Sequence, residues 1–111
     1  EGTPAMMWKT LSQFKKLPLD TKIYSGHEYA IKNLEFALSV DSKNKDLQKK
    51  YAQIKDLIYR NLPAVPSTIR DELKINPFLR ANTIEIKKAL NMLKDTDENV
   101  FAELRRRRDS F

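Results

Sequence analysis

Residues 45–61, KDLQKKYAQIKDLIYRN, contain the clearest helical pattern in the chain. Their apolar side chains recur at intervals of four, three and four residues, which places them on one face of an α-helix: Leu47, Tyr51, Ile54 and Ile58. Most of the other positions in the segment are polar or charged. The pattern therefore predicts an amphipathic helix that turns one face toward a core.

Helical periodicity continues upstream of this segment. Thr3-Pro4 predicts an N-cap followed by proline at the first helical position, where the missing N–H costs nothing. The helix that follows is expected to end near Leu17-Pro18, and a second helix is expected over residues 28–40. Their inward-facing residues are expected to be Met7, Leu11, Phe14, Ile31, Leu34 and Leu38.

Downstream, residues 62–66 predict an extended connector, because residues before proline avoid the α region. Thr68 and Asp71 resemble a capping box at the start of a short helix, which Asn76-Pro77 ends. Further helices are expected from Thr83 and over residues 97–108. Their inward-facing residues are expected to be Ile86, Leu90, Leu93, Val100, Phe101 and Leu104.

Residues 22–25 are the one strand-like stretch in this mostly α sequence. A lone strand cannot satisfy its backbone hydrogen bonds, so it indicates the edge of a sheet that this chain does not supply. The alternative is an extended loop that runs over a helical surface.

Composition excludes several classes of protein. The 111 residues include 21 Lys and Arg against 15 Asp and Glu, a net charge of +6, with no cysteine and one histidine. The chain has no disulfide framework, zinc ribbon or thiol nucleophile, and it cannot build a His-rich metal site by itself. Its apolar runs are too short to span a membrane, and residues 1–4 do not resemble a signal peptide. These features indicate a single soluble domain from a reducing compartment.

The single histidine lies in Ser25-Gly26-His27-Glu28-Tyr29, between the strand-like stretch and a helix. Junctions of this kind project side chains into the crevice above a sheet. His27 is therefore a candidate ligand or acid–base group, with an ordinary structural histidine as the alternative. Tyr29 on its own would be read as a packed aromatic residue with a satisfied hydroxyl.

Arg105-Arg106-Arg107-Arg108 is the second conspicuous feature. On a helix, Arg105 and Arg108 are three residues apart, so both can point toward one carboxylate or phosphate. The alternative is a solvated run of cations that complements the dipole at the end of a helix. Nucleic-acid binding is disfavoured, because the lysines are spread along the chain among acidic residues and no recognised motif is present.

Together these residues resemble hydroxyacylglutathione hydrolase, also called glyoxalase II. The resemblance rests on short motifs in the family's order: Glu1-Gly2-Thr3, then Gly26-His27-Glu28-Tyr29 with Asn33-Leu34 and Phe36-Ala37, Val65-Pro66-Ser67-Thr68, Asn76-Pro77-Phe78-Leu79-Arg80, and Arg105-Arg106-Arg107-Arg108-Asp109-Ser110-Phe111. It implies the end of a metallo-β-lactamase-type αββα sandwich over residues 1–40, with a strand whose sheet lies upstream. Residues 41–111 would then form the family's all-α domain, which binds the glutathione thioester.

The family hydrolyses S-D-lactoylglutathione to glutathione and D-lactate. The reaction depends on two metal ions, usually zinc with iron or manganese as alternatives, which activate water and polarise the thioester carbonyl. By position, His27 resembles the last histidine ligand of the metal site. Tyr29 resembles a residue that contacts glutathione, and Arg105 and Arg108 resemble the pair that binds its glycine carboxylate. The chain departs from the family at Arg108, commonly lysine, and at Ala30, commonly threonine.

The family's T-H-x-H-x-D-H motif is absent from this sequence. We therefore expect a C-terminal fragment of a cytoplasmic enzyme, with the mitochondrion as the alternative location, that is inactive and without metal when alone. Without the upstream domain, Met7, Trp8, Leu11 and Ile23 are expected to be unburied, and the fragment is expected to be poorly ordered there or to self-associate. The alternative function is a non-catalytic helical module that binds glutathione or an acidic partner through its arginines.

Overall fold

The computed structural model describes residues 3–111 and is mostly helical, which confirms the expected fold class. In chain order the elements are α1 (Pro4–Phe14), β1 (Lys22–Ile23), α2 (His27–Val40), α3 (Lys45–Tyr59), β2 (Ser67–Thr68), α4 (Ile69–Ile75), α5 (Ile84–Ala89) and α6 (Asp97–Asp109). Most helices begin at a side chain whose oxygen accepts a hydrogen bond from a backbone N–H of the first turn. These N-caps are Thr3, Asn44, Thr68, Thr83 and Thr96.

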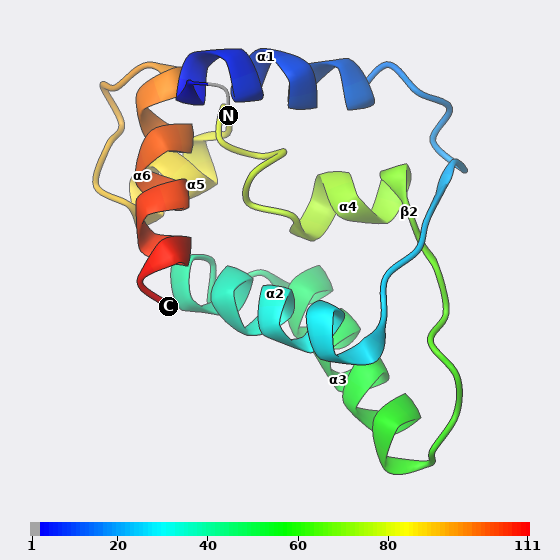
Figure 1. The fold of residues 1–111 in the computed structure, drawn as a ribbon. Coiled ribbons are helices and arrows are strands. Elements are labelled where there is room, and N and C mark those ends of the chain that lie inside the picture. Colours follow the sequence, from blue (N-terminus) through cyan, green and yellow to red (C-terminus); the bar gives the residue numbers. More distant parts are fainter. Residues whose placement is uncertain (1–2) are drawn as a thin grey trace.

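The helices pack in pairs: α1 crosses α6, and α2 lies against α3, with α4 also in contact with α3 (Figure 1). One apolar cluster lies among α1, α2, α5 and α6, and its centre is formed by Phe101, Leu104 and Ile86. A second cluster lies among α2, α3 and α4 around Leu47 and Ile54. Helix α2 contributes to both clusters and so connects them. The division of the chain after residue 40 into two domains stays a prediction.

Helix α1 is packed rather than left without a partner. Trp8 is only 8% exposed, and its ring lies 5.9 Å from that of Phe101 on α6. Met7, Leu11 and Ile23 are half-buried. The expectation that Trp8 is unburied was therefore wrong, because its ring packs against Phe101 of α6 within this chain. Self-association stays a prediction.

Three residues expected to face inward are exposed instead. Phe14 and Ile58 lie at the ends of their helices and Leu93 lies in the turn after α5, and their exposed fractions are 43%, 43% and 57%. Periodicity identifies the stripe of a helix but not how far the neighbouring element extends along it.

The strand-like stretch finds a partner inside the chain. β1 pairs antiparallel with β2, with Lys22 opposite Thr68 and Ile23 opposite Ser67. Backbone hydrogen bonds continue the contact, since Ile69 N donates to Thr21 O and Arg70 N donates to Leu19 O. The inference that this chain supplies no partner strand was wrong, because the connector after α3 returns beside residues 19–23. A sheet on the other side of β1 stays a prediction.

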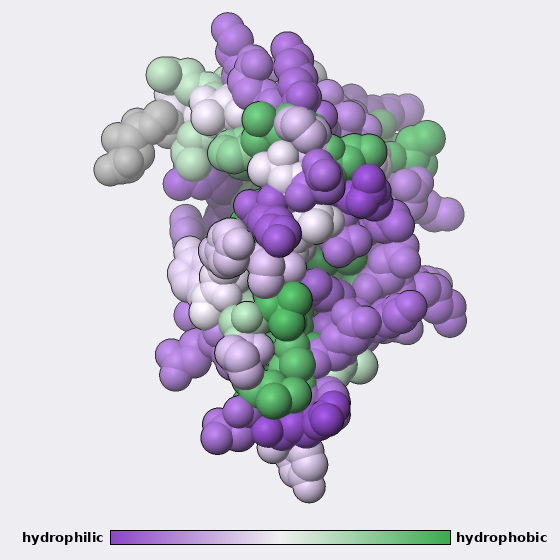
Figure 2. Space-filling view, turned by 90° about the vertical axis from the view of Figure 1, so that its right-hand side faces the viewer, coloured by the Kyte–Doolittle hydropathy of each residue, from purple (hydrophilic) through white to green (hydrophobic). Residues whose placement is uncertain are grey.

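The face that contains this connector carries a hydrophobic band between polar side chains (Figure 2). Exposed apolar residues of the connector and of its neighbours include Tyr24, Leu62 and Val65. Among the described residues, no helix has the length and apolar character needed to cross a membrane.

Candidate functional site

A cleft of about 590 Å³ lies between α2 and the segment that runs from α4 into residues 76–78. The β1–α2 junction, α3, the connector before β2 and the end of α6 also contribute to its lining. Of the residues singled out in the sequence, His27, Tyr29 and Arg108 line this cleft, and Arg105 does not. Arg108 therefore shares one surface with His27 and Tyr29, although it is far from them in the sequence.

His27 is the first residue of α2, and its imidazole has one occupied nitrogen and one free nitrogen. Nε2 lies 2.7 Å from the carbonyl oxygen of Leu62. Because a carbonyl can only accept, Nε2 carries the hydrogen, and in the neutral imidazole Nδ1 then carries a lone pair. Nδ1 is buried and has no hydrogen-bond partner among the described residues. An imidazole that donates from one nitrogen to a backbone carbonyl is a common arrangement in histidines that bind metal.

The end of α3 fixes the carbonyl that holds His27. Asn61 has a φ of 56°, and its N–H donates to Ile58 O, while Leu62 N donates to Leu57 O. This pair of bonds is a Schellman motif, which satisfies the last carbonyls of a helix and turns the chain sharply. Leu62 is the last residue of this motif, and its carbonyl group points at the His27 ring.

Tyr29 lies two residues further along α2 and is 67% exposed at the cleft. Ala30 lines the same cleft and packs against the apolar cluster of α2, α3 and α4.

The two arginines expected to act as a pair have partners on different helices. Arg108 Nη2 donates to Asn33 Oδ1 on α2 at 3.4 Å, at the cleft. Arg105 Nη1 lies 2.6 Å from Met7 Sδ on α1. The side chains therefore do not converge on one point here, and joint binding of one carboxylate by both stays a prediction.

Comparison with known proteins gives the family. A family model described as hydroxyacylglutathione hydrolase C-terminus matches residues 28–111. The chain belongs to the hydroxyacylglutathione hydrolase family. This finding confirms the resemblance seen in the sequence motifs.

Relatives named hydroxyacylglutathione hydrolase match the whole chain. One from Maricaulis maris is 50% identical over 111 residues, which make up 43% of that relative. Others from Roseobacter denitrificans and Bartonella henselae are 45% and 44% identical, and in each the match makes up 44% of the relative. The chain thus spans less than half the length of these hydroxyacylglutathione hydrolases.

The family is generally metal-dependent, so the fit of a metal to these residues can be tested. Residues 3–111 contain no group of three or more His, Cys, Asp or Glu side chains that could hold an ion. The lone pair of the His27 ring nevertheless fits one ligand position. In this chain, His27 could supply one ligand, and the remaining ligands would have to come from outside the described residues.

Arg106 and Arg107 both form ion pairs with Glu103, which lies one turn earlier on α6. Arg106 Nη2 and Arg107 Nε lie 2.6 Å and 2.7 Å from Glu103 Oε2. These hydrogen bonds lower the pKa of Glu103 from 4.5 to about 2. Of the four consecutive arginines, only Arg108 reaches the cleft.

We expect the free energy of unfolding of the Glu103→Gln variant to fall less steeply than that of the wild type as the pH is lowered below 4.5. Because the folded-state pKa of Glu103 is lowered, its contribution is present above pH 4.5 and is lost as the pH falls toward 2. Its partners are partly exposed, so the contribution is limited to about 1 kcal/mol. Urea unfolding between pH 5 and about pH 2 measures it, and an unchanged slope in the variant would contradict the assignment.

Several residues that line the cleft were not predicted from the sequence. Asn33 and Asn76 lie inside the motifs that resemble the family, so the sequence could have indicated them. Lys50 and Glu72 lie in no such motif. Glu72 accepts hydrogen bonds from Ser67 Oγ at 2.7 Å and Asn76 Nδ2 at 3.1 Å, so it ties β2 to the end of α4.

Proposed function

We propose that this chain is the C-terminal part of a metal-dependent thioester hydrolase that converts S-D-lactoylglutathione and water to glutathione and D-lactate. The observation that carries the proposal is the cleft shared by His27, Tyr29 and Arg108. It occurs in a chain whose relatives, matched along its full length, are named hydroxyacylglutathione hydrolase.

His27 would contribute one ligand to a dinuclear site, occupied by zinc with iron or manganese as alternatives, whose other ligands belong to an upstream domain. When bound, the metals would supply a water of lowered pKa as the nucleophile and would polarise the thioester carbonyl. The part of His27 is to present one imidazole nitrogen in a fixed orientation, and the carbonyl of Leu62 restrains the ring.

Arg108 and Tyr29 would bind the glutathione part of the substrate, which lies away from the reacting bond. A guanidinium presents a planar fork of N–H donors that matches a carboxylate, so Arg108 suits the anionic end. Tyr29 offers an exposed ring and hydroxyl on the same cleft. Arg105 would join Arg108 only after leaving Met7.

The chain by itself would be inactive, because one histidine cannot hold a dinuclear site. It would still bind glutathione weakly through Arg108 and Tyr29. Robust thioester hydrolysis by the purified 111-residue chain would contradict this assignment.

The next test uses the full-length enzyme of which this chain is proposed to be the C-terminal part. There we expect Arg108→Ala to raise KM for the glutathione thioester about 10-fold or more, while kcat changes little. The lost charged hydrogen bonds act on the remote end of the substrate in both the ground state and the transition state. Steady-state kinetics separates the two constants. Arg106→Ala is the matched control, since Arg106 is 68% exposed and paired with Glu103. Equal losses in kcat and kcat/KM would refute the binding role of Arg108.

A further inference from the structure

We propose that Phe111 is the positioning residue that holds Arg108 at the cleft. The inference rests on the proposed function of Arg108 in binding the glutathione carboxylate. It begins with the last turn of α6, from Arg105 to Asp109. The buried residues of α6 are Val100, Phe101 and Leu104, and all of them precede this turn. The last turn therefore contains no buried residue, and its contact on the α1 side is that of Arg105 with Met7.

Phe111 supplies an apolar contact on the α2 side. Its ring lies 5.6 Å from that of Phe36 on α2, with an angle of 74° between the planes. This edge-to-face arrangement is favourable for aromatic pairs. The Phe111 N–H donates to the carbonyl oxygen of Arg108 at 3.2 Å, so the backbone of Phe111 is bonded directly to the arginine that it positions.

Phe36 is a rigid anchor. It is 2% exposed, and its ring stacks on that of Phe78 with 5.7 Å between centroids. Phe78 in turn packs edge-to-face against Phe101 in the core. Phe36 and Phe78 both line the cleft, so the ring of Phe111 is attached to the wall of the site itself.

Two contacts therefore join the last turn of α6 to a single turn of α2. Arg108 meets Asn33, and Phe111 meets Phe36, three residues further along α2. Arginine has a large rotamer entropy, which must be lost when it binds an anion. Because the aromatic pair fixes the backbone that carries Arg108, the guanidinium reaches the cleft with fewer conformations left to exclude.

The test compares four forms of the 111-residue chain: wild type, Phe111→Ala, Phe111→Tyr and Phe14→Ala. Phe14 is 43% exposed and Phe111 51%, so the Phe14 variant removes a similarly exposed ring at a distant place. The first readout, without ligand, is the mobility of the Arg108 Nε–H group from ¹⁵N relaxation. The second is the Kd for glutathione from the chemical shifts of α2 and α6.

We expect Phe111→Ala to make the Arg108 side chain more mobile and to raise the Kd by up to about fivefold, the limit reached if the whole energy of one aromatic pair serves to hold Arg108 in place. Phe111→Tyr should restore both values, and Phe14→Ala should change neither. Unchanged Arg108 mobility in Phe111→Ala would overturn the proposal. So would a loss of affinity that tyrosine does not rescue, because that result indicates a general structural role.

Failure of the proposed function gives a different result. If wild-type chain shows no glutathione-dependent shift at Arg108, then Arg108 is not a glutathione contact in this chain. The mobility of Arg108 in Phe111→Ala still decides, without any ligand, whether Phe111 positions it.

Discussion

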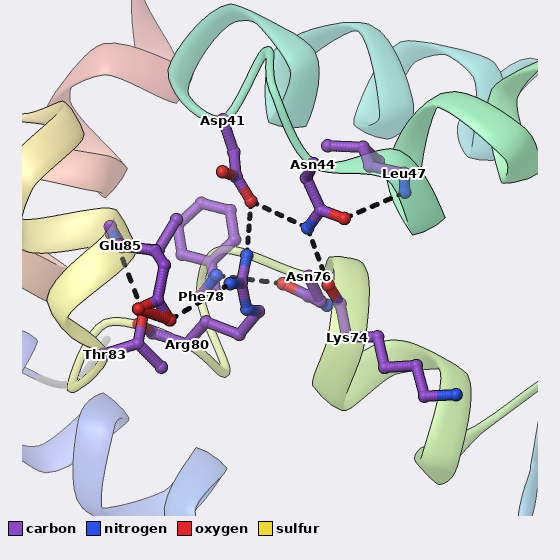
Figure 3. Close-up of polar contacts among 10 residues, drawn as sticks. Asp41, Asn44, Leu47, Lys74, Asn76, Phe78, Arg80, Thr83 and Glu85 are labelled. Atoms are coloured by element: carbon purple, nitrogen blue, oxygen red, sulfur yellow. Dashed lines mark hydrogen bonds and ion pairs between the residues drawn. The ribbon is translucent and has the colours of Figure 1, made fainter.

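We expect Asp41→Ala to lower the free energy of unfolding by about 3–5 kcal/mol, the cost of breaking a buried ion pair from one side. The side chains of Asp41 and its partner Arg80 are only 11% and 12% exposed. Asp41 Oδ2 accepts hydrogen bonds from Arg80 Nη1 and from Asn44 Nδ2, the latter at 2.9 Å (Figure 3). Removal of the carboxylate leaves a guanidinium buried without its main counter-charge.

Other groups nearby cannot replace the lost carboxylate. Glu85 lies 3.8 Å from Arg80 but is 65% exposed, so its interaction is screened by solvent. Asn44 also holds together the surrounding elements. It donates to Lys74 O at 2.7 Å and accepts from Leu47 N at 3.2 Å as the N-cap of α3. The network thus joins the α2–α3 corner to α4 and to the segment before α5.

Urea and thermal unfolding measure the effect, and we expect the melting temperature to fall by more than about 10 °C. Asp56→Ala is the matched control. Asp56 pairs with Arg60 at 3.5 Å, but both side chains are about 60% exposed, so the loss should be below about 1 kcal/mol. The double variant Asp41→Leu, Arg80→Met should regain much of the stability, because no unpaired charge remains. Equal effects of Asp41→Ala and Asp56→Ala would contradict the argument.

In the longer protein, we expect His27→Gln to reduce thioester hydrolysis by more than about 100-fold and to remove about one metal ion per chain. Glutamine keeps a polar side chain at the start of α2 but offers no imidazole lone pair. Elemental analysis of the purified protein gives the metal content, and thioester hydrolysis gives the activity. Glu28→Gln, which changes an exposed neighbour in the first turn of α2, is the control.

This variant also separates a metal ligand from a structural histidine. If the only role of His27 were its hydrogen bond to Leu62, then His27→Gln would lower the free energy of unfolding by about 1 kcal/mol and leave the metal content unchanged. Full metal content together with full activity in the variant would refute the assignment of His27.

Local features of the fold could be predicted from the sequence because they depend on neighbouring residues. Thr3, Thr68 and Thr83 start helices where their hydroxyls can accept from the first turn, and all three were expected. The buried face of α3 could also be predicted, since Leu47 and Ile54 are buried as the periodicity of their segment indicates.

Features that depend on residues far apart in the chain could not be predicted in this way. The partner of β1 lies more than 40 residues away, and nothing in Lys22–Ile23 identifies Ser67–Thr68. The spacing of Arg105 and Arg108 predicts that both can point toward one anion, but it cannot predict that the position of α1 places Met7 beside Arg105. The pair formed by Asp41 and Arg80 has no sequence signal, because each residue alone resembles a surface charge.

Helix α2 has a geometric consequence for substrate choice. It carries His27 at its first residue and Asn33, the contact of Arg108, six residues later. An α-helix rises 1.5 Å per residue, so these positions are about 9 Å apart along a rigid rod. That spacing is the reach of two to three extended residues. With the roles proposed for His27 and Arg108, α2 would set the separation between the metal end and the carboxylate end of the substrate, and one residue inserted between the two positions would rotate them by about 100° relative to each other.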